Sequence, residues 1–485
     1  MRKQIGVLIL MLSTSIIGFA QKKITISGTI KEPVDGKMIM VNASGTELSQ
    51  DPKQENITVS PEGTFTISLP VTEEYNWIIA VHGNKRIDFI AAAGSNLQLT
   101  ATGVEFDATI HFEGKGNELP NYFAQLMKSK GGIMSYYRTL QELSALEPDA
   151  YPKAVDSVQA VELAYLEQNK TGLPKNFVAY WNDFLRFGAY DALLNYPMVH
   201  EMIRLKTNQI QSIPAASFVV SNKAPRVFDD RFIGLSYYQS YVMNYYTSQL
   251  NAVGFSNGRP VDANASAEDR KASYRQTDSV LNLLYKNAPK KTAQLIAGRI
   301  IVGSAKMWNL AELEEHVATY KNQFPKTENG KVLDAIVKEI KKFNPGQPAV
   351  DFAFKTLEGK DMKLSDLKGK VVYMDFWASW CGPCKGEMPH AMKLKEQFKN
   401  KDVVFLYVSI DDKEDAWKRG IDAMQIEGIH TRTAGWGGEI AKLYKIQSVP
   451  AYYLIDKKGN FVLDKTPRPS QSALLSSEIE KLLQK

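Results

Sequence analysis

Cysteine is nearly absent from this sequence of 485 residues, which contains only Cys381 and Cys384. They lie three positions apart, and a disulfide between them closes a loop too short to cross-link a fold, so the pair indicates chemistry. Beyond the first twenty residues, no apolar run approaches the ~20 residues that a membrane-spanning helix needs. The formal charge of +6 is too small and too dispersed to indicate a nucleic-acid partner.

The first twenty residues have the pattern of a secretory signal peptide. A basic start, Met1-Arg-Lys3, precedes an apolar run from Ile5 to Phe19 that is shorter than a bilayer span. We therefore expect cleavage after Ala20, export to the periplasm or cell envelope of a bacterium, and no stable membrane insertion afterwards. An uncleaved membrane anchor is the alternative.

The hydrophobic pattern divides the rest of the chain into three regions. Polar and apolar residues alternate from about 22 to 112, which predicts an antiparallel β-sandwich-like domain. Helical spacing follows, with many aromatic residues that we expect to fill a core; a ligand groove is the alternative. After a proline-rich linker, strands alternate with helices, which predicts a mostly parallel sheet covered on both faces. The predicted parts are a signal peptide (1–20), a β-rich domain (21–115), an α-helical domain (116–342), a linker (343–348) and an α/β domain (349–485).

The cysteine pair follows a predicted buried strand, and a helix is expected to begin at the pair. The unpaired N–H groups of a helix N-terminus stabilise an anion, so the pKa of the Cys381 thiol should be lowered. Cys384, one turn further on, is placed to attack the mixed disulfide that Cys381 forms with a substrate. A zinc half-site is the competing interpretation, but zinc takes four ligands and the chain has no second cysteine pair. We therefore expect no metal and no cofactor.

The segment from about 347 to 482 resembles the thioredoxin superfamily. The resemblance is carried by Asp375-Phe-Trp-Ala-Ser-Trp-Cys-Gly-Pro-Cys-Lys385, by Pro389 and by Ser448-Val-Pro-Ala-Tyr-Tyr-Leu-Ile-Asp456. It implies a thioredoxin-like fold for residues 349–485.

Two further resemblances refine this assignment. Pro348-Ala-Val-Asp-Phe352, the lead-in from Leu364 to Lys370 and an extra helical segment between Asp411 and Ile429 are similar to the exported TlpA/ResA subgroup. The N-terminal part, which ends in Phe112-Glu-Gly-Lys-Gly-Asn-Glu118, is similar to an uncharacterised β-domain that precedes such thioredoxin domains in some bacterial envelope proteins.

The thioredoxin resemblance implies catalytic roles for two acidic residues. Asp375 matches the buried carboxylate beneath the dithiol, where burial raises the pKa and suits the group to exchange a proton with Cys384. A strand-end acid that reaches water is the alternative. Glu387 lies where the TlpA/ResA subgroup places an acid near the active site, and the alternative is a first-turn acid that complements the helix dipole.

The same resemblance implies three substrate-binding residues. Pro450 matches a cis-proline that lies against the dithiol, and Val449 would pair through its backbone with an extended substrate chain. Trp380 is expected to shield one side of the sulfur atoms, whereas Trp377 is expected to pack in the core.

The resemblance implies an exported thiol:disulfide oxidoreductase acting as a reductase, because its Gly-Pro dipeptide resembles that of reducing thioredoxins. Its partners would be exported proteins with disulfides, with apo-cytochrome c as one candidate, and a membrane electron donor. One alternative is a peroxiredoxin-like peroxidase, although the Pro-x-x-x-Thr-x-x-Cys pattern is missing at this position. Another is an envelope binding protein with an accessory redox domain.

Overall fold

The computed structural model describes residues 22–44, 48, 53–206, 217–251, 267–305, 308–463 and 465–485. The predicted signal peptide, residues 1–20, lies outside the described residues. Contacts within the chain divide it into two compact units, Met1–Asn257 and Gly258–Lys485, and each is described by itself. The helices predicted between 116 and 342 belong to both units, and the predicted domain boundaries stay predictions.

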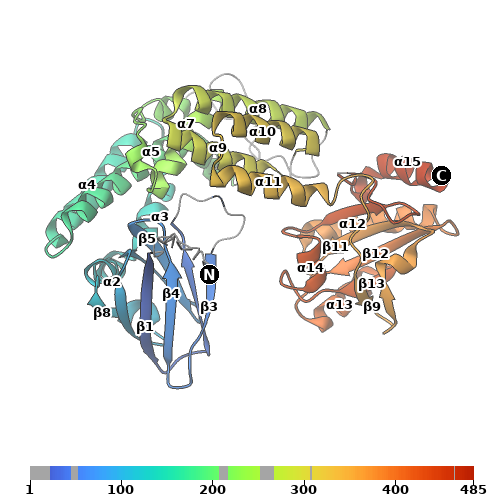
Figure 1. Cartoon of the computed structure of the whole chain (residues 1–485), viewed down its shortest axis with the longest axis horizontal. Helices are drawn as coiled ribbons and strands as arrows, with labels where there is room; N and C mark the ends of the chain where they lie inside the picture. The colour runs from blue at the N-terminus through green and yellow to red at the C-terminus, as the bar shows by residue number, and fades with distance from the viewer. Residues whose placement is uncertain are drawn as a thin grey trace, which may run out of the picture. The chain divides into compact units, whose positions relative to one another are not determined.

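The first unit begins with two four-stranded sheets, ordered β4-β1-β7-β8 and β3-β2-β5-β6 (Figure 1). The alternating pattern produces them, since every second residue of β1, such as Ile24 and Ile26, is buried. Phe89 and Phe112 bring the two sheets into contact, with ring centroids 4.9 Å apart. The strands are β1 (Lys23–Lys31), β2 (Lys37–Asn42), β3 (Lys53–Thr58), β4 (Thr64–Pro70), β5 (Tyr75–His82), β6 (Lys85–Ala92), β7 (Asn96–Thr102) and β8 (His111–Lys115).

One strand pair departs from the predicted antiparallel arrangement. β1 and β7 run parallel, with Ile26 opposite Leu97, whereas the other described pairs of these two sheets are antiparallel. The chain visits the second sheet twice between β1 and β7 and returns beside β1 in the same direction.

Helices complete the first unit, and many of the aromatic residues of this region are buried in its core, as predicted. Tyr238 and Tyr241 are fully buried. A Cβ atom on Gly188 of α5 would lie 2.9 Å from Tyr136 and 3.0 Å from Tyr237, so glycine lets these rings approach the α5 backbone. The helices are α1 (Phe106–Thr109), α2 (Glu118–Lys130), α3 (Ile133–Leu143), α4 (Tyr151–Asn169), α5 (Lys175–Leu205), α6 (Phe218–Ser221), η2 (Asp230–Phe232) and α7 (Ser236–Asn251).

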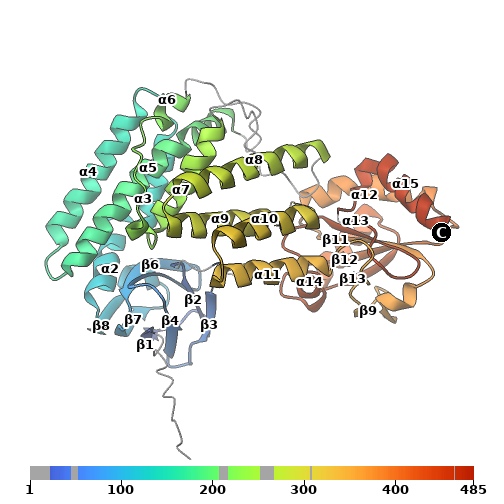
Figure 2. The ribbon, with the colours of Figure 1, turned by 45° about the horizontal axis from the view of Figure 1, so that its top comes forward.

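The second unit begins with four helices that lie side by side (Figure 2). They are α8 (Ala267–Asn287), α9 (Lys290–Ser304), α10 (Leu310–Gln323) and α11 (Glu328–Lys341). α10 begins with a capping box, in which Asn309 and Glu312 each accept the other's backbone N–H at 2.9 Å. The predicted linker then packs against the C-terminal part of the unit: the Phe343 ring lies 5.7 Å from that of Phe461, and the Gly346 N–H donates to the Phe461 carbonyl.

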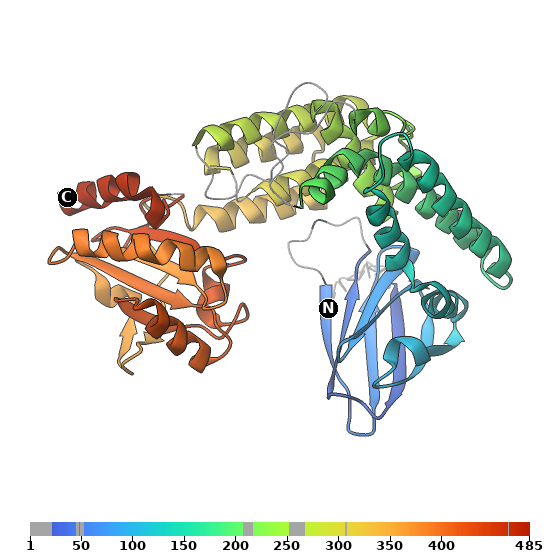
Figure 3. The same ribbon diagram turned by 180° about the vertical axis from the view of Figure 1, so that it is seen from behind.

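The C-terminal part contains a four-stranded sheet ordered β13-β12-β11-β14. β11, β12 and β13 are parallel and β14 is antiparallel to β11. Helices α12 and α15 lie on one face of this sheet, and α13 and α14 on the other (Figures 1 and 3). Its elements are β9 (Ala353–Lys355), β10 (Asp361–Lys363), η3 (Leu364–Leu367), β11 (Val371–Trp377), α12 (Gly382–Gln397), β12 (Val403–Ser409), α13 (Glu414–Met424), β13 (Ile429–Arg432), α14 (Glu439–Leu443), β14 (Ala451–Ile455), η4 (Pro469–Gln471) and α15 (Ser472–Leu483).

Two details of this part differ from the sequence prediction. The turn signal Lys458-Gly-Asn460 predicts a strand from Phe461 to Asp464, but in the structure Phe461 forms only an isolated bridge with Ile455, and Asp464 lies outside the described residues. The short strands β9, β10 and β13 were not predicted, because three or four residues are too few to establish a period. Within the described residues, every helix is too short or too polar to cross a bilayer.

Candidate active site

The central strand β11 leads the chain to the cysteine pair. All seven residues of Val371–Trp377 are buried, because β12 and β14 pair with both edges of the strand and helices cover both faces. Asp375 is the acid within this strand, opposite Tyr407 on one side and Tyr452 on the other. The Ala378–Trp380 segment then connects the carboxyl end of β11 to α12.

Cys381 is the N-cap residue of α12, as the sequence predicts. Its Sγ accepts a hydrogen bond from the backbone N–H of Cys384 at 3.1 Å, and the two cysteines form a disulfide. Cys384 is fully buried and Cys381 is 4% exposed. The structure therefore contains the oxidised form of the pair, with the first sulfur at the positive end of the helix.

The predicted cis peptide bond joins Val449 to Pro450. The carbonyl oxygen of Val449 lies 3.7 Å from Cys381 Sγ. A disulfide sulfur has no proton to donate, so this is a packing contact in the oxidised form and becomes a weak S–H···O interaction when Cys381 is a thiol. The structure thus brings Val449 and Cys381 together.

Asp375 is fully buried, as predicted, and does not reach water at the strand end. Neither carboxyl oxygen has a hydrogen-bond partner among the described residues. Burial raises the pKa of Asp375 well above its ordinary value, and the negative charge of Glu387 raises it further. Burial and the charge of Asp375 also raise the pKa of Tyr407 and of Tyr452, whose hydroxyl groups have no described partner.

Glu387 is buried in the second turn of α12, and no acid lies in the first turn, so the first-turn alternative is wrong. Its two carboxyl oxygens accept hydrogen bonds from Ser470, one from the backbone N–H at 2.8 Å and one from the hydroxyl at 2.9 Å. Arg468 lies 3.9 Å away. Glu387 also acts electrostatically on Asp375, because its charge contributes to the raised pKa of that acid.

Trp380 lies at the surface beside the start of α12 and is 56% exposed. Its ring centroid is 6.1 Å from that of Trp436, which is 44% exposed and was not singled out from the sequence. Trp377 is fully buried and packs in the core, as predicted. The two exposed rings form an aromatic pair that we call the Trp380–Trp436 pair.

Asp411 holds the segment between β11 and α12, a role that the sequence analysis missed. Its carboxylate accepts hydrogen bonds from the Ser379 N–H at 2.9 Å, the Ser379 hydroxyl at 2.7 Å and the Ser409 hydroxyl at 2.8 Å. The signal was available, because polar residues at the carboxyl end of a buried parallel strand commonly lie at a functional site. In the described part of the chain, no three His, Cys, Asp or Glu residues are grouped to hold a metal ion.

Comparison with known proteins identifies this region. A family model described as the AhpC/TSA family matches residues 345–463. The chain is 35% identical over 121 residues to the thiol-disulfide oxidoreductase ResA of Bacillus thuringiensis subsp. konkukian, which is 25% of this chain and 69% of that protein. It is 36% identical over 136 residues to ResA of Oceanobacillus iheyensis, which is 26% of this chain and 70% of that protein.

Among solved structures, the thioredoxin domain of a thiol-disulfide oxidoreductase from Bacteroides vulgatus is 28% identical, with a TM-score of 0.27. That match covers 29% of this chain and 97% of the other. The ResA matches each cover more than two thirds of the relative at over 30% identity. The chain therefore belongs to the ResA family of thiol-disulfide oxidoreductases, and its C-terminal part is a thioredoxin-like enzyme domain.

Proposed function

We propose that this protein is an exported reductase of protein disulfides, in which Cys381 attacks and Cys384 resolves. The observation that carries the proposal is the Cys381–Cys384 disulfide at the start of α12, where Cys381 Sγ accepts the Cys384 N–H. A thiolate at the same position would receive this hydrogen bond and the favourable field of the helix N-terminus. Both lower the pKa of the Cys381 thiol and favour the nucleophilic form.

The proposed reaction is a pair of disulfide exchanges. The Cys381 thiolate attacks one sulfur of the substrate disulfide, so that a mixed disulfide forms, the substrate S–S bond breaks and one substrate thiolate leaves. The Cys384 thiolate then attacks Cys381 Sγ and releases the second substrate thiol. Two electrons pass to the substrate, and the enzyme is left with the Cys381–Cys384 disulfide. A dithiol donor, assigned to a membrane partner, reduces this disulfide by the same exchange in reverse.

We propose that Asp375 is the base that accepts the proton of the Cys384 thiol. The Cys384 thiol must lose its proton before it attacks, and a buried carboxylate with a raised pKa is a stronger base than an ordinary one. The absence of described hydrogen-bond partners supports the assignment, because both oxygens of Asp375 can accept a proton. Glu387 acts on this step through Asp375, whose pKa its charge raises.

We propose that an extended segment of the substrate pairs with the backbone of Val449 beside Pro450. The 3.7 Å separation between the Val449 carbonyl oxygen and Cys381 Sγ supports this arrangement, because a paired chain would present its own disulfide to that sulfur. The exposed ring of Trp380 would contact apolar side chains next to the substrate disulfide. The substrates would be envelope proteins that the chain meets after export by residues 1–20, with apo-cytochrome c as one candidate.

The direction of exchange is tested by equilibrating the full chain with glutathione buffers and measuring the fraction of the Cys381–Cys384 disulfide. A reductase should have a potential close to the value of about −270 mV typical of thioredoxin. A value close to about −120 mV, typical of the oxidant DsbA, would contradict the reductase assignment.

The substrates are tested by trapping. Cys384→Ala should accumulate mixed disulfides on Cys381 that mass spectrometry identifies, because the resolving thiol is missing. A variant with both cysteines replaced by alanine is the matched control. Capture of the same proteins by the control would favour the envelope binding protein. Rapid oxidation of Cys381 to a sulfenate by hydrogen peroxide, without trapped proteins, would favour the peroxidase.

A further inference from the structure

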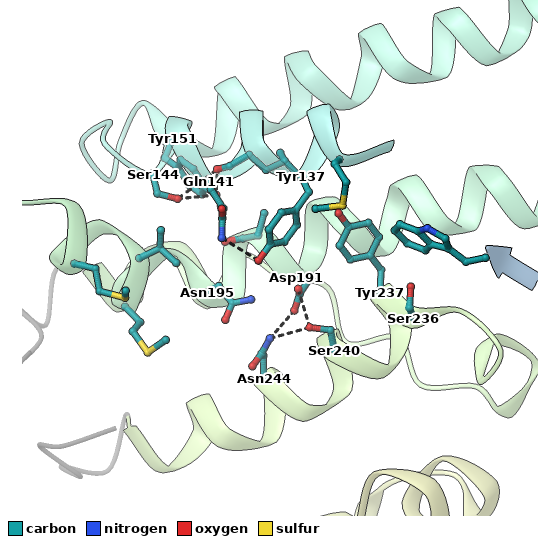
Figure 4. A pocket seen from close by; sticks show the side chains of 18 residues that line it. Tyr137, Gln141, Ser144, Tyr151, Asp191, Asn195, Ser236, Tyr237, Ser240 and Asn244 are labelled. Carbon is teal, nitrogen blue, oxygen red and sulfur yellow. Dashed lines mark hydrogen bonds between the residues drawn. The ribbon is translucent and has the colours of Figure 1, made fainter. Parts of the chain in front are cut away.

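A cavity of about 610 Å³ lies within the first unit, among helices α3, α4, α5 and α7, with Trp77 of β5 in its lining (Figure 4). This volume is within the roughly 300–1,000 Å³ typical of small-ligand sites. Most of the lining is apolar or aromatic. Tyr137 and Met198 line the cavity and are 39% and 43% exposed, so the cavity opens to solvent on their side.

One buried acid, Asp191 of α5, lies in this lining. Its Oδ1 accepts a hydrogen bond from Asn244 at 2.7 Å and its Oδ2 accepts one from Ser240 at 2.9 Å, both from α7. Burial raises the pKa of Asp191 to about 6, and hydrogen bonds from Asn244, Ser240 and Asn195 limit the rise. No lysine, arginine or histidine is among the described lining residues. A buried carboxylate with only neutral partners is therefore complementary to a ligand cation.

Two aromatic rings lie near the same carboxylate. Tyr137 and Tyr237 stack with centroids 6.4 Å apart and an interplanar angle of 26°. The charge of Asp191 adds to burial in raising the pKa of both tyrosines, which places them within its electrostatic range. In Figure 4, Asp191 lies between these rings and the two donors from α7. Ring faces attract cations, so the rings and the carboxylate favour the same kind of ligand.

We propose that this cavity binds a small organic cation, in which an ammonium group pairs with Asp191 beside Tyr137 and Tyr237 and an apolar body fills the rest. The site is separate from the cysteine pair, and the proposal does not depend on disulfide exchange. The side chains that form the site come from helices α3, α5 and α7, and the rings of Tyr136, Phe184 and Tyr237 pack these helices against one another.

The proposal predicts a specific pH dependence. The titratable groups that interact with Asp191 are Tyr137, Tyr151 and Tyr237. Burial raises the pKa of all three above the ordinary value of 10.0, so they stay neutral between pH 5 and pH 8. Of these four groups, Asp191 is the one that changes charge in this range. An alkylammonium ligand should therefore bind more tightly as the pH rises through about 6.

The test is calorimetric titration of the full chain with three matched probes: 4-phenylbutylamine, 4-phenylbutan-1-ol and 4-phenylbutyrate. At pH 7.5 we expect the amine to bind at least about tenfold more tightly than the alcohol, a factor equivalent to about 1.4 kcal/mol, and the carboxylate not to bind. The preference for the amine should shrink at pH 5. Equal or tighter binding of the alcohol at pH 7.5, or no binding of the amine at millimolar concentration, would overturn the proposal.

Asp191→Asn keeps the size of the side chain and removes its charge. This variant should lose the preference for the amine, retain binding of the alcohol and reduce disulfides at the wild-type rate. Asp183→Asn is the control, because Asp183 lies on the same helix, pairs with Arg186 and does not line the cavity. An amine preference that survives in Asp191→Asn overturns the proposal. If that variant does not fold, the ratio of amine to alcohol affinity in the wild-type protein still tests the proposal.

Discussion

Ser470 donates two hydrogen bonds to the carboxylate of Glu387, one from its backbone N–H and one from its hydroxyl. The two residues are 83 positions apart, and the bonds join the helix that carries the cysteine pair to the η4 segment near the C-terminus. Because the charge of Glu387 also contributes to the raised pKa of Asp375, this contact links the position of α12 to the pKa of that buried acid.

Glu387→Ala should lower the free energy of unfolding by about 2–3 kcal/mol, because it leaves a partly buried N–H without an acceptor and removes two charge-assisted hydrogen bonds. Ser470→Ala, which keeps the backbone donor, should cost about 1 kcal/mol. Urea denaturation of the oxidised proteins measures both values. If Ser470→Ala lowered the free energy of unfolding as much as Glu387→Ala does, the backbone N–H bond would contribute nothing, which would contradict the prediction.

Glu387→Gln should lower the pKa of Asp375 without returning it to the ordinary range, because burial is the larger cause of the shift. The pH profile of the step in which Cys384 releases the substrate should therefore shift to lower pH. Pre-steady-state pH profiles of release from a mixed disulfide measure this shift. Glu396→Gln on the exposed side of the same helix is the control and should leave the profile in place.

Asp375→Asn should make the oxidised protein more stable at neutral and alkaline pH. The folded-state pKa of Asp375 lies well above its ordinary value of 3.8, so the folded state holds the proton more tightly. That stabilising contribution is complete below pH 3.8 and is lost as the pH rises through the raised pKa. Asparagine cannot ionise, so the difference in unfolding free energy should grow in favour of the variant between pH 4 and pH 8. A difference that stays constant over this range would show that Asp375 does not titrate as proposed.

Replacing Trp380 or Trp436 by alanine should weaken the binding of protein substrates and spare small ones. An exposed aromatic contact contributes about 0.5–1.5 kcal/mol, so KM for an unfolded protein disulfide should rise by about twofold to tenfold. KM for glutathione disulfide should stay unchanged. Leu474→Ala, another exposed apolar residue of this unit, is the control. An equal rise in KM for both substrates would show that the Trp380–Trp436 pair stabilises the cysteine site and does not bind the protein substrate.

Local patterns predicted the parts of the structure that local forces determine. The continuous apolar run of β11 and the start of α12 at Cys381 follow from adjacent residues. The cis bond before Pro450 was expected from the resemblance to thioredoxins and not from the local pattern. The parallel pairing of β1 with β7 could not be predicted, because alternation of polar and apolar residues is the same in either direction.

The site residues that were missed depend on distant contacts. Trp436 and Ser470 lie in loops or short turns and reach their partners only through the tertiary fold. The cavity beside Asp191 was missed for a different reason. Aromatic residues at helical spacing have the same pattern whether they fill a core or line a pocket, so the pattern alone does not reveal the cavity.

The packing of Phe343 determines where the redox domain can be cut. A truncated chain beginning at Ala349 would lose this ring and leave the faces of Tyr444, Tyr453 and Phe461 uncovered on that side. It would also lose the main-chain bond from Gly346 to Phe461. Uncovered aromatic surface of this kind promotes aggregation. A fragment that does not aggregate through this surface must therefore begin upstream of Phe343, within the last residues of α11.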